Sequence, residues 1–213
     1  MKHIFFIDLD NTIYFTKPNE KILMSGLYNL LDQEDLGISD RDYQSAKKEM
    51  LRTPFLKVAE KYGFNKEVTD RTVEFLANRE VVEPLQPGED YPYIKALEGR
   101  KFIFTAGFPK QQLSKVNMLG IADDFESVFV IDVAKTSKKE AFEEFIKKEN
   151  LNRSEILIIG DDAESEIKFG LELGIETFLL DPDHLHLDAQ TTYRGTDLSS
   201  LPEITGQKNK SSF

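Results

Sequence analysis

The sequence contains no cysteine among its 213 residues. This absence excludes disulfide bonds, catalysis by a thiolate and zinc sites built from cysteine. No stretch approaches the roughly eighteen consecutive apolar residues of a membrane-spanning helix. The N-terminus also lacks the long apolar run and the small-residue cleavage site of a secretory signal peptide. We therefore expect a cytoplasmic protein without a membrane partner.

Basic residues are scarce relative to acidic ones. The chain has 27 Lys and Arg against 38 Asp and Glu, which gives a formal net charge of -11. Nucleic-acid binding needs a basic footprint, so we expect no nucleic-acid partner. A small anionic substrate stays possible, because a metal ion and a few local cations can reverse the field inside one cleft.

Short apolar runs alternate with amphipathic stretches along most of the chain. An apolar run that ends in a turn is typical of a strand covered on both faces, as in a parallel sheet. Alternation of such strands with helices predicts a doubly wound α/β fold. The expected strands are 2–7, 101–104, 127–131, 155–159 and 176–180, and the expected helices are 111–119, 138–150 and 164–173. Residues 193–204 could add one more strand and helix.

The segment from 15 to 84 breaks this alternation, because it shows helical spacing only. The expected helices there are 22–32, 40–51, 54–62 and 66–79. Residues 83–88 contain two prolines and a glycine and look like a return linker. We therefore predict an α/β core formed by 1–14 and 85–213, with an all-helical cap inserted at 15–84.

The first strand ends in Asp8-Leu9-Asp10-Asn11-Thr12. A carboxylate such as Asp8 can attack phosphorus, and a bridging magnesium ion would reduce its repulsion from the phosphate. Asp10 faces the same side if the chain stays extended, so it could protonate the leaving oxygen and then activate water. Its backbone carbonyl could also ligate the metal, and Thr12 would steady the turn. Alone, the segment is also typical of a strand end with capping acids.

Two later segments supply candidates for phosphate binding. The hydroxyl of Thr105 and the backbone N–H groups of Ala106 and Gly107 would cradle phosphate oxygens. Lys135 would act as a positive point charge that attracts both the phosphate and Asp8. Lys138 follows closely, so the identity of the site lysine stays open. Each segment alone is also typical of a turn threonine or of a lysine at a helix start.

A fourth segment places acids after the aliphatic run 156–159. Asp161 is positioned to ligate magnesium, which prefers one or two carboxylates together with waters and phosphate oxygens. Asp162 and Glu166 could orient those waters. The expected metal ligands are therefore Asp8, Asp10 and Asp161.

Ligands of an open parallel sheet bind at the carboxyl ends of its strands, where all four segments place their polar residues. This combination resembles the haloacid dehalogenase-like superfamily, and specifically its phosphatase branch with a helical cap. The positions that match the family's motifs are Asp8, Asp10, Thr12, Thr105, Lys135, Asp161 and Asp162. The resemblance covers essentially the whole chain and implies magnesium-dependent hydrolysis of a phosphomonoester through an aspartyl-phosphate. The second aspartate of the first motif resembles the phosphatases rather than the dehalogenases.

The sequence departs from the family pattern at three positions. Lys135 is followed by Thr136 where the family often has proline, Ala106 stands where asparagine is common, and Glu166 stands where aspartate is usual. The first departure leaves the identity of the site lysine open, and the second leaves one phosphate or substrate contact open. The third leaves open how far the longer side chain of Glu166 reaches.

Residues 8–14 resemble those of the nucleotidase-type members of this superfamily, so the first substrate expected is a nucleoside monophosphate. A sugar phosphate or phosphoglycolate is expected almost as strongly. The alternatives are a phosphosugar mutase and a non-catalytic phosphate-binding protein. A receiver module of a signalling system is disfavoured, because it carries its acidic pair on the first strand. The oligomeric state is left open.

The cap is expected to set substrate choice. Its candidates for substrate contact or hinge motion are Tyr14, Phe15, Lys17, Arg52 and Arg79. His184 and His186 are spaced like a metal pair, but no third ligand lies nearby in the sequence, and we expect a solvated loop there.

Overall fold

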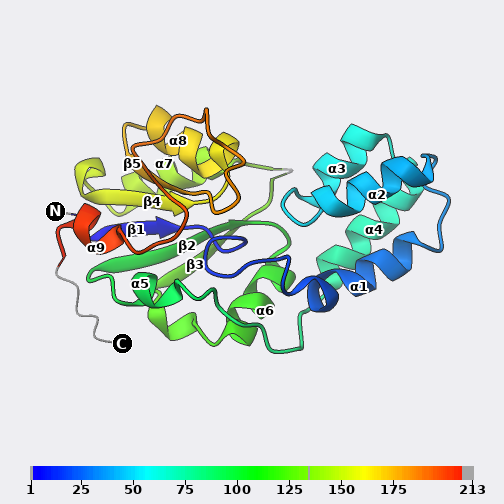
Figure 1. Ribbon diagram of the computed structural model, residues 1–213, viewed down its shortest axis with the longest axis horizontal. Coiled ribbons are helices and arrows are strands. Elements are labelled where there is room, and N and C mark those ends of the chain that lie inside the picture. The colour runs from blue at the N-terminus through cyan, green and yellow to red at the C-terminus, as the bar shows by residue number, and fades with distance from the viewer. Residues whose placement is uncertain (1, 134, 208–213) are drawn as a thin grey trace.

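The computed structural model describes residues 2–133 and 135–207 (Figure 1). Its centre is one sheet with the strand order β3-β2-β1-β4-β5-β6, and every neighbouring pair is parallel. The strands are β1 Ile4–Ile7, β2 Arg100–Ala106, β3 Ser127–Ile131, β4 Ile156–Gly160, β5 Glu176–Leu180 and β6 Tyr193–Gly195. The five expected strands are confirmed, and β6 is the additional strand that residues 193–204 were expected to be able to form.

The register of the sheet brings distant segments to one edge. Ile7, the last residue of β1, lies opposite Ile103 of β2 and Ile159 of β4. The residues that follow β1 and β4, and those near the end of β2, therefore leave the sheet at the same level. This edge is where an open parallel sheet binds its ligands.

Helices cover both faces of the sheet, as the doubly wound prediction requires. They are α5 Tyr91–Lys95, α6 Pro109–Leu119, α7 Lys138–Lys148, α8 Lys168–Glu172 and α9 Leu201–Thr205, with short 3-10 turns at Ala122–Asp124 and Arg153–Glu155. On one face, Phe6 of β1 packs against Phe142 and Phe145 of α7. On the other face, Phe5 and Ile7 belong to the cluster that holds the buried side chains of α5 and α6.

The helix expected over 164–173 is interrupted. A π-helical turn, Ala163–Ile167, precedes α8, and Ser165 inside it has the non-helical angles φ -116° and ψ -108°. The interruption lies directly after β4, where the site is built.

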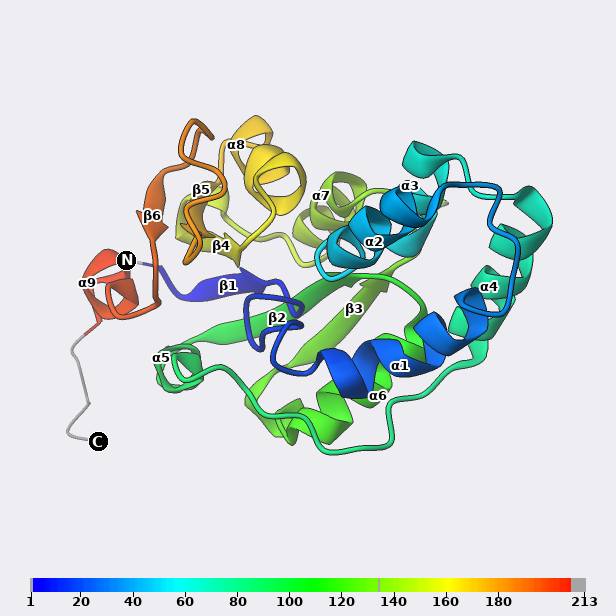
Figure 2. The same ribbon diagram turned by 45° about the vertical axis from the view of Figure 1, so that its right-hand side comes forward.

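Four helices follow β1 and precede α5: α1 Glu20–Leu31, α2 Asp40–Glu49, α3 Phe55–Tyr62 and α4 Lys66–Asn78. Local signals explain their ends, since the Ser39 side chain accepts from the N–H of Asp42 at the start of α2, and Gly63 ends α3 with φ +74°. Figures 1 and 2 show this four-helix insertion beyond the carboxyl ends of the strands. The boundaries 15 and 84 remain a prediction.

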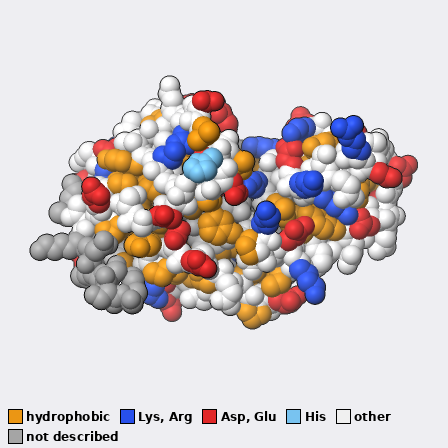
Figure 3. Space-filling view, viewed as in Figure 1, with side chains coloured by type: hydrophobic (Ala, Val, Ile, Leu, Met, Phe, Trp, Pro, Cys, Tyr) orange, Lys and Arg blue, Asp and Glu red, His pale blue; other side chains and the backbone are white. Residues whose placement is uncertain are grey.

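The surface of the insertion is rich in cations on one side. Figure 3 shows Lys and Arg side chains on its visible face, next to the hollow that separates it from the sheet and its helices. Within the described ranges, none of the helices is long and apolar enough to cross a membrane.

Candidate active site

Asp8 lies at the centre of a buried cluster of charges. It follows β1 directly, and its N–H donates to the carbonyl of Ile159, so the sheet holds its backbone. The Nζ atom of Lys138 lies 2.5 Å from Asp8 Oδ1 and 2.7 Å from Glu166 Oε2. All three residues are buried. A buried cation held between two carboxylates is stable only because each charge has its partner.

Lys135 lies outside this cluster, which corrects the expectation that it contacts Asp8. Its Nζ atom pairs with Asp132 at 2.7 Å, and its side chain is 81% exposed. The reason is the start of α7: Ser137 and Glu140 form a capping box, which makes Lys138 the first helical residue. Lys135 precedes the cap in the loop. The spacing Ser137-x-x-Glu140 was the sequence signal that could have identified the correct lysine.

Three carboxylates of the site can hold a metal ion together. Ligand atoms of Asp8, Asp161 and Glu166 all lie within 4.8 Å of one another. Burial is the main cause that raises the pKa of Asp8 to about 7, with Glu166 adding to it and Lys138 opposing it. Burial, followed by the charges of Glu166 and Asp8, also raises the pKa of Asp161. This excess of buried negative charge and the hard oxygen donors fit a magnesium ion.

Glu166 enters this group rather than only orienting waters from behind it, because its long side chain folds back over Gly160. A Cβ atom on Gly160 would lie 2.2 Å from Glu166 Oε1. The same oxygen accepts from the N–H of Asp162 at 2.9 Å, and the side chain of Asp162 accepts from the N–H of Glu164. The glycine and the π-helical turn thus make room for glutamate where the family usually has aspartate.

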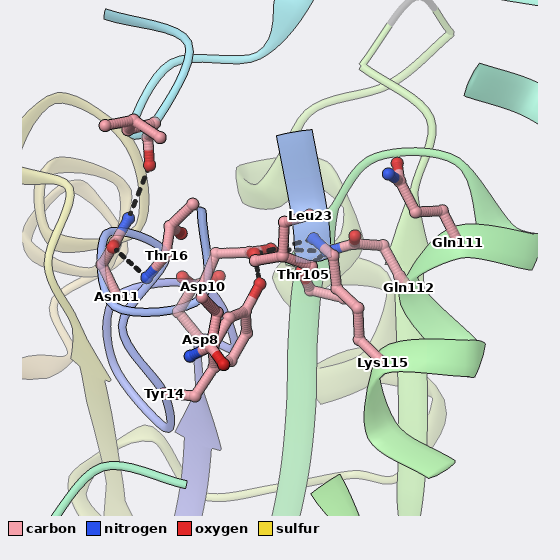
Figure 4. A network of polar contacts seen from close by, with 12 residues as sticks. Asp8, Asp10, Asn11, Tyr14, Thr16, Leu23, Thr105, Gln111, Gln112 and Lys115 are labelled. Carbon is pink, nitrogen blue, oxygen red and sulfur yellow. Dashed lines mark hydrogen bonds and ion pairs between the residues drawn. The ribbon is translucent and has the colours of Figure 1, made fainter. Parts of the chain in front are cut away.

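Asp10 turns toward Gln112 and Lys115 of α6 (Figure 4), and its side chain is not part of the three-carboxylate group. Its Oδ1 accepts from Lys115 Nζ at 2.7 Å and from the hydroxyl of Tyr14. Its Oδ2 accepts from Gln112 Nε2 at 2.7 Å, and the same nitrogen donates to Thr105 Oγ1 at 2.5 Å. Burial raises the pKa of Asp10, but the charge and hydrogen bond of Lys115, together with the hydrogen bonds from Tyr14 and Gln112, outweigh it, so the pKa is lowered overall.

Gln112 and Lys115 are the residues that the sequence interpretation missed. They lie three positions apart on α6, which places them on one face of the helix. A glutamine and a lysine at this spacing, soon after the residues that end β2, were the available signal. Metal ligation by the side chain of Asp10 finds no support in this arrangement, and ligation by its backbone carbonyl remains a proposal.

Gly107 corrects a second expectation about phosphate binding. Its N–H donates to the carbonyl of Ile131 at 3.0 Å, because β2 continues its pairing with β3 beyond its last residue. This N–H is therefore not free for a phosphate oxygen. Thr105 is 1% exposed and bound to Gln112, and the role of Ala106 stays a prediction.

The turn after Asp10 is held from two sides. Asn11 adopts φ +57°, and its side chain accepts from the N–H of Thr16 at 3.1 Å. Its amide nitrogen also donates to the carbonyl of Leu51, at the end of the α2 region. Thr12, which was expected to steady this turn, is buried, and its hydroxyl has no hydrogen-bond partner within the described ranges.

Arg52 is an insertion residue whose side chain reaches the site. Its guanidinium lies 3.2 Å from Asp161 Oδ2 and 2.8 Å from Asp183 Oδ2. Arg79, another candidate, instead donates to the carbonyls of Ile22 and Leu23 inside the insertion. The metal-competent group found in the described chain includes neither His184 nor His186.

The chain matches a family model described as haloacid dehalogenase-like hydrolase over residues 2–174. It is 28% identical to the pyrimidine 5'-nucleotidase PynA of Streptococcus pneumoniae over 160 residues, which cover 70% of this chain and 65% of that protein. It is 33% identical to the pyrimidine 5'-nucleotidase YjjG of Escherichia coli over 85 residues, 38% of each chain. The matches thus span less than two thirds of these curated relatives.

Solved structures share the fold at low sequence identity. YfnB from Bacillus subtilis, described as a HAD hydrolase bound to magnesium, aligns with a TM-score of 0.68 and 20% identity over 96% of this chain and 98% of its own. A HAD phosphatase from Thermococcus onnurineus aligns with a TM-score of 0.67 and 19% identity over 98% and 99%. Because the family model spans most of its length, the chain belongs to the haloacid dehalogenase-like hydrolases.

Proposed function

We propose that the protein is a magnesium-dependent phosphatase that hydrolyses a nucleoside monophosphate through an aspartyl-phosphate on Asp8. The observation that carries this proposal is the buried pair of Asp8 and Lys138, 2.5 Å apart, inside a group of carboxylates that fits a metal ion. The two pyrimidine 5'-nucleotidases among its relatives favour a nucleotide over a sugar phosphate or phosphoglycolate. We also propose that it acts in the cytoplasm.

The reaction would proceed in two steps. First, a carboxylate oxygen of Asp8 attacks phosphorus, the bond to the ester oxygen breaks, and that oxygen leaves with the electron pair and takes a proton from Asp10. Next, water attacks phosphorus and gives a proton to Asp10, and the bond to Asp8 breaks with its electron pair returning to the carboxylate. One ester and one water are consumed, and an alcohol and inorganic phosphate are formed.

The residues of the site suit these steps. Lys138 neutralises Asp8 in the free site and would attract the phosphate oxygens during transfer. Thr105 would donate its hydroxyl to the phosphate. An anionic phosphate beside Asp10 favours the protonated form of this acid and so opposes the lowering of its pKa by Lys115. A magnesium ion held by Asp8 and Asp161, with Glu166 beside it, would supply electrostatic shielding of the phosphate.

The test is the release of inorganic phosphate from a panel of nucleoside monophosphates and sugar phosphates, with magnesium or with EDTA. Asp8→Asn should abolish release, whereas Asp188→Asn, which changes an exposed loop residue, should leave it intact. Magnesium binding without release from any compound would overturn the proposal and would favour a phosphosugar mutase or a non-catalytic phosphate-binding protein.

A further inference from the structure

The carboxylate of Asp10 is held by side chains that take no part of their own in the two proposed reaction steps. Lys115 and Tyr14 donate to Oδ1, and Gln112 donates to Oδ2 (Figure 4). Both oxygens are thus fixed, and both donors on α6 are buried: Gln112 is 1% exposed and Lys115 is 8% exposed. Placing a lysine here requires its desolvation, and the ion pair with Asp10 at 2.7 Å compensates for that cost.

Gln112 joins Asp10 to the phosphate side of the site. Its Nε2 carries two hydrogens, and it donates to both Asp10 Oδ2 and Thr105 Oγ1. Its side chain has little freedom, since a Cβ atom on Gly107 would lie 3.1 Å from Gln112 Cγ. The separation between the acid and the threonine hydroxyl is therefore set by one buried amide.

We propose that Lys115 and Gln112 are positioning residues that act through Asp10 and hold its carboxylate in line with the ester oxygen of a bound phosphomonoester. This inference rests on the proposed function for the reaction it serves. Lys115 fixes one oxygen by charge, and Gln112 fixes the other relative to Thr105. Loss of Lys115 would leave Oδ1 to the hydroxyl of Tyr14, and loss of Gln112 would remove the donor to Oδ2, so in either case the carboxylate would be held less firmly toward the leaving oxygen.

The experiment compares kcat/KM for two esters that differ in their need for a proton. The alkyl ester, uridine monophosphate, has a poor leaving group that requires protonation, whereas p-nitrophenyl phosphate has a good leaving group that needs little. A loss of folded protein lowers both values equally, so the ratio between the two substrates isolates the acid step. The variants are Lys115→Met, Lys115→Arg and Gln112→Leu, with Asp10→Asn as the reference.

We expect Lys115→Met and Gln112→Leu to lower the alkyl-to-aryl ratio about 10- to 100-fold, part of the effect of general acid catalysis. Lys115→Arg, which keeps the charge, should restore much of the ratio. The matched control is Lys110→Met on the same helix, because Lys110 is half exposed and pairs with Glu80 at 3.3 Å, away from Asp10. An unchanged ratio in Lys115→Met, with a lowered ratio in Asp10→Asn, would overturn the proposal.

A second measurement separates this inference from the proposed function. Urea unfolding of Lys115→Met, Asp10→Asn and the double variant forms a cycle that reports their interaction without any reaction. Non-additive losses of stability support the contact, and additive losses refute it. An enzyme that hydrolyses neither ester would refute the proposed function, while the cycle would still decide whether Lys115 holds Asp10.

Discussion

Replacement of Lys138 by methionine tests the charge cluster most directly. Methionine keeps most of the buried volume but removes the cation that lies 2.5 Å from Asp8 and 2.7 Å from Glu166. Removing one partner of a buried ion pair costs about 3–5 kcal/mol, because the remaining charges lose their compensation. Since a domain of this kind has about 5–15 kcal/mol of stability in total, the variant should fold but unfold at a much lower urea concentration.

The loss should depend on pH with a definite sign. A carboxyl group that is protonated needs no counter-charge, and the pKa of Asp8 is already raised to about 7 by burial. Lys138→Met should therefore be less destabilised at pH 5 than at pH 8, where an ionised Asp8 would lack its counter-charge. The assay is urea unfolding in EDTA, followed by far-UV circular dichroism because the chain has no tryptophan.

Lys135→Met is the matched control for this variant. Lys135 has the same side chain three residues earlier, but its Nζ atom lies in solvent and pairs with Asp132. We expect no measurable change in stability and full phosphatase activity, whereas Lys138→Met should lose activity at least about 100-fold. The assignment of the site lysine would be refuted by a large loss of stability or activity in Lys135→Met. It would also be refuted if Lys138→Met were as stable at pH 8 as the native protein.

Three further changes test other parts of the structure. Gly160→Ala should destabilise the protein by about 1–3 kcal/mol in urea unfolding, because the new Cβ atom would overlap the side chain of Glu166. Gly26→Ala on α1 is the control and should not destabilise it, because the nearest atom to its new Cβ, on Phe75, lies 3.4 Å away. Asp181→Asn should cost about 1–3 kcal/mol at pH 7, since burial raises the pKa of Asp181 but two backbone N–H donors and an arginine lower it overall. That contribution is present above the unfolded pKa near 3.9 and is lost as pH falls through the folded value, so the gap between native and variant should close toward pH 2. Arg52→Met should strengthen magnesium binding severalfold in titration calorimetry, because it removes a cation that shares Asp161; weaker binding would mean that Arg52 organises this carboxylate.

Much of the fold could be predicted because its signals are local. The apolar runs 4–7 and 156–159 each predicted a strand covered on both faces, and they form the central strands β1 and β4. The capping serine at 39 and the helix-ending glycine at 63 marked helix ends within the insertion. Since Asp8 and Asp161 directly follow their strands, their place at the carboxyl edge of the sheet also followed from the sequence.

Other features could not be predicted in the same way. The break in the helix after β4 depends on Glu166 folding over Gly160, a contact between side chain and backbone that no periodicity reveals. The N–H of Gly107 is occupied because β2 pairs with β3 beyond the expected strand 101–104. Both corrections arise from hydrogen bonds that form only after the chain has folded.

The sequence by itself determined which residue types gather at one edge of the sheet, because an apolar run and the polar residue after it are neighbours along the chain. Only the tertiary structure decided which partners they find there. It selected Lys138 over Lys135, turned Asp10 toward Gln112 and Lys115, and brought Arg52 to Asp161. The physical reason is that the direction of a long charged side chain depends on burial and on partners remote in sequence, which spacing along the chain does not encode.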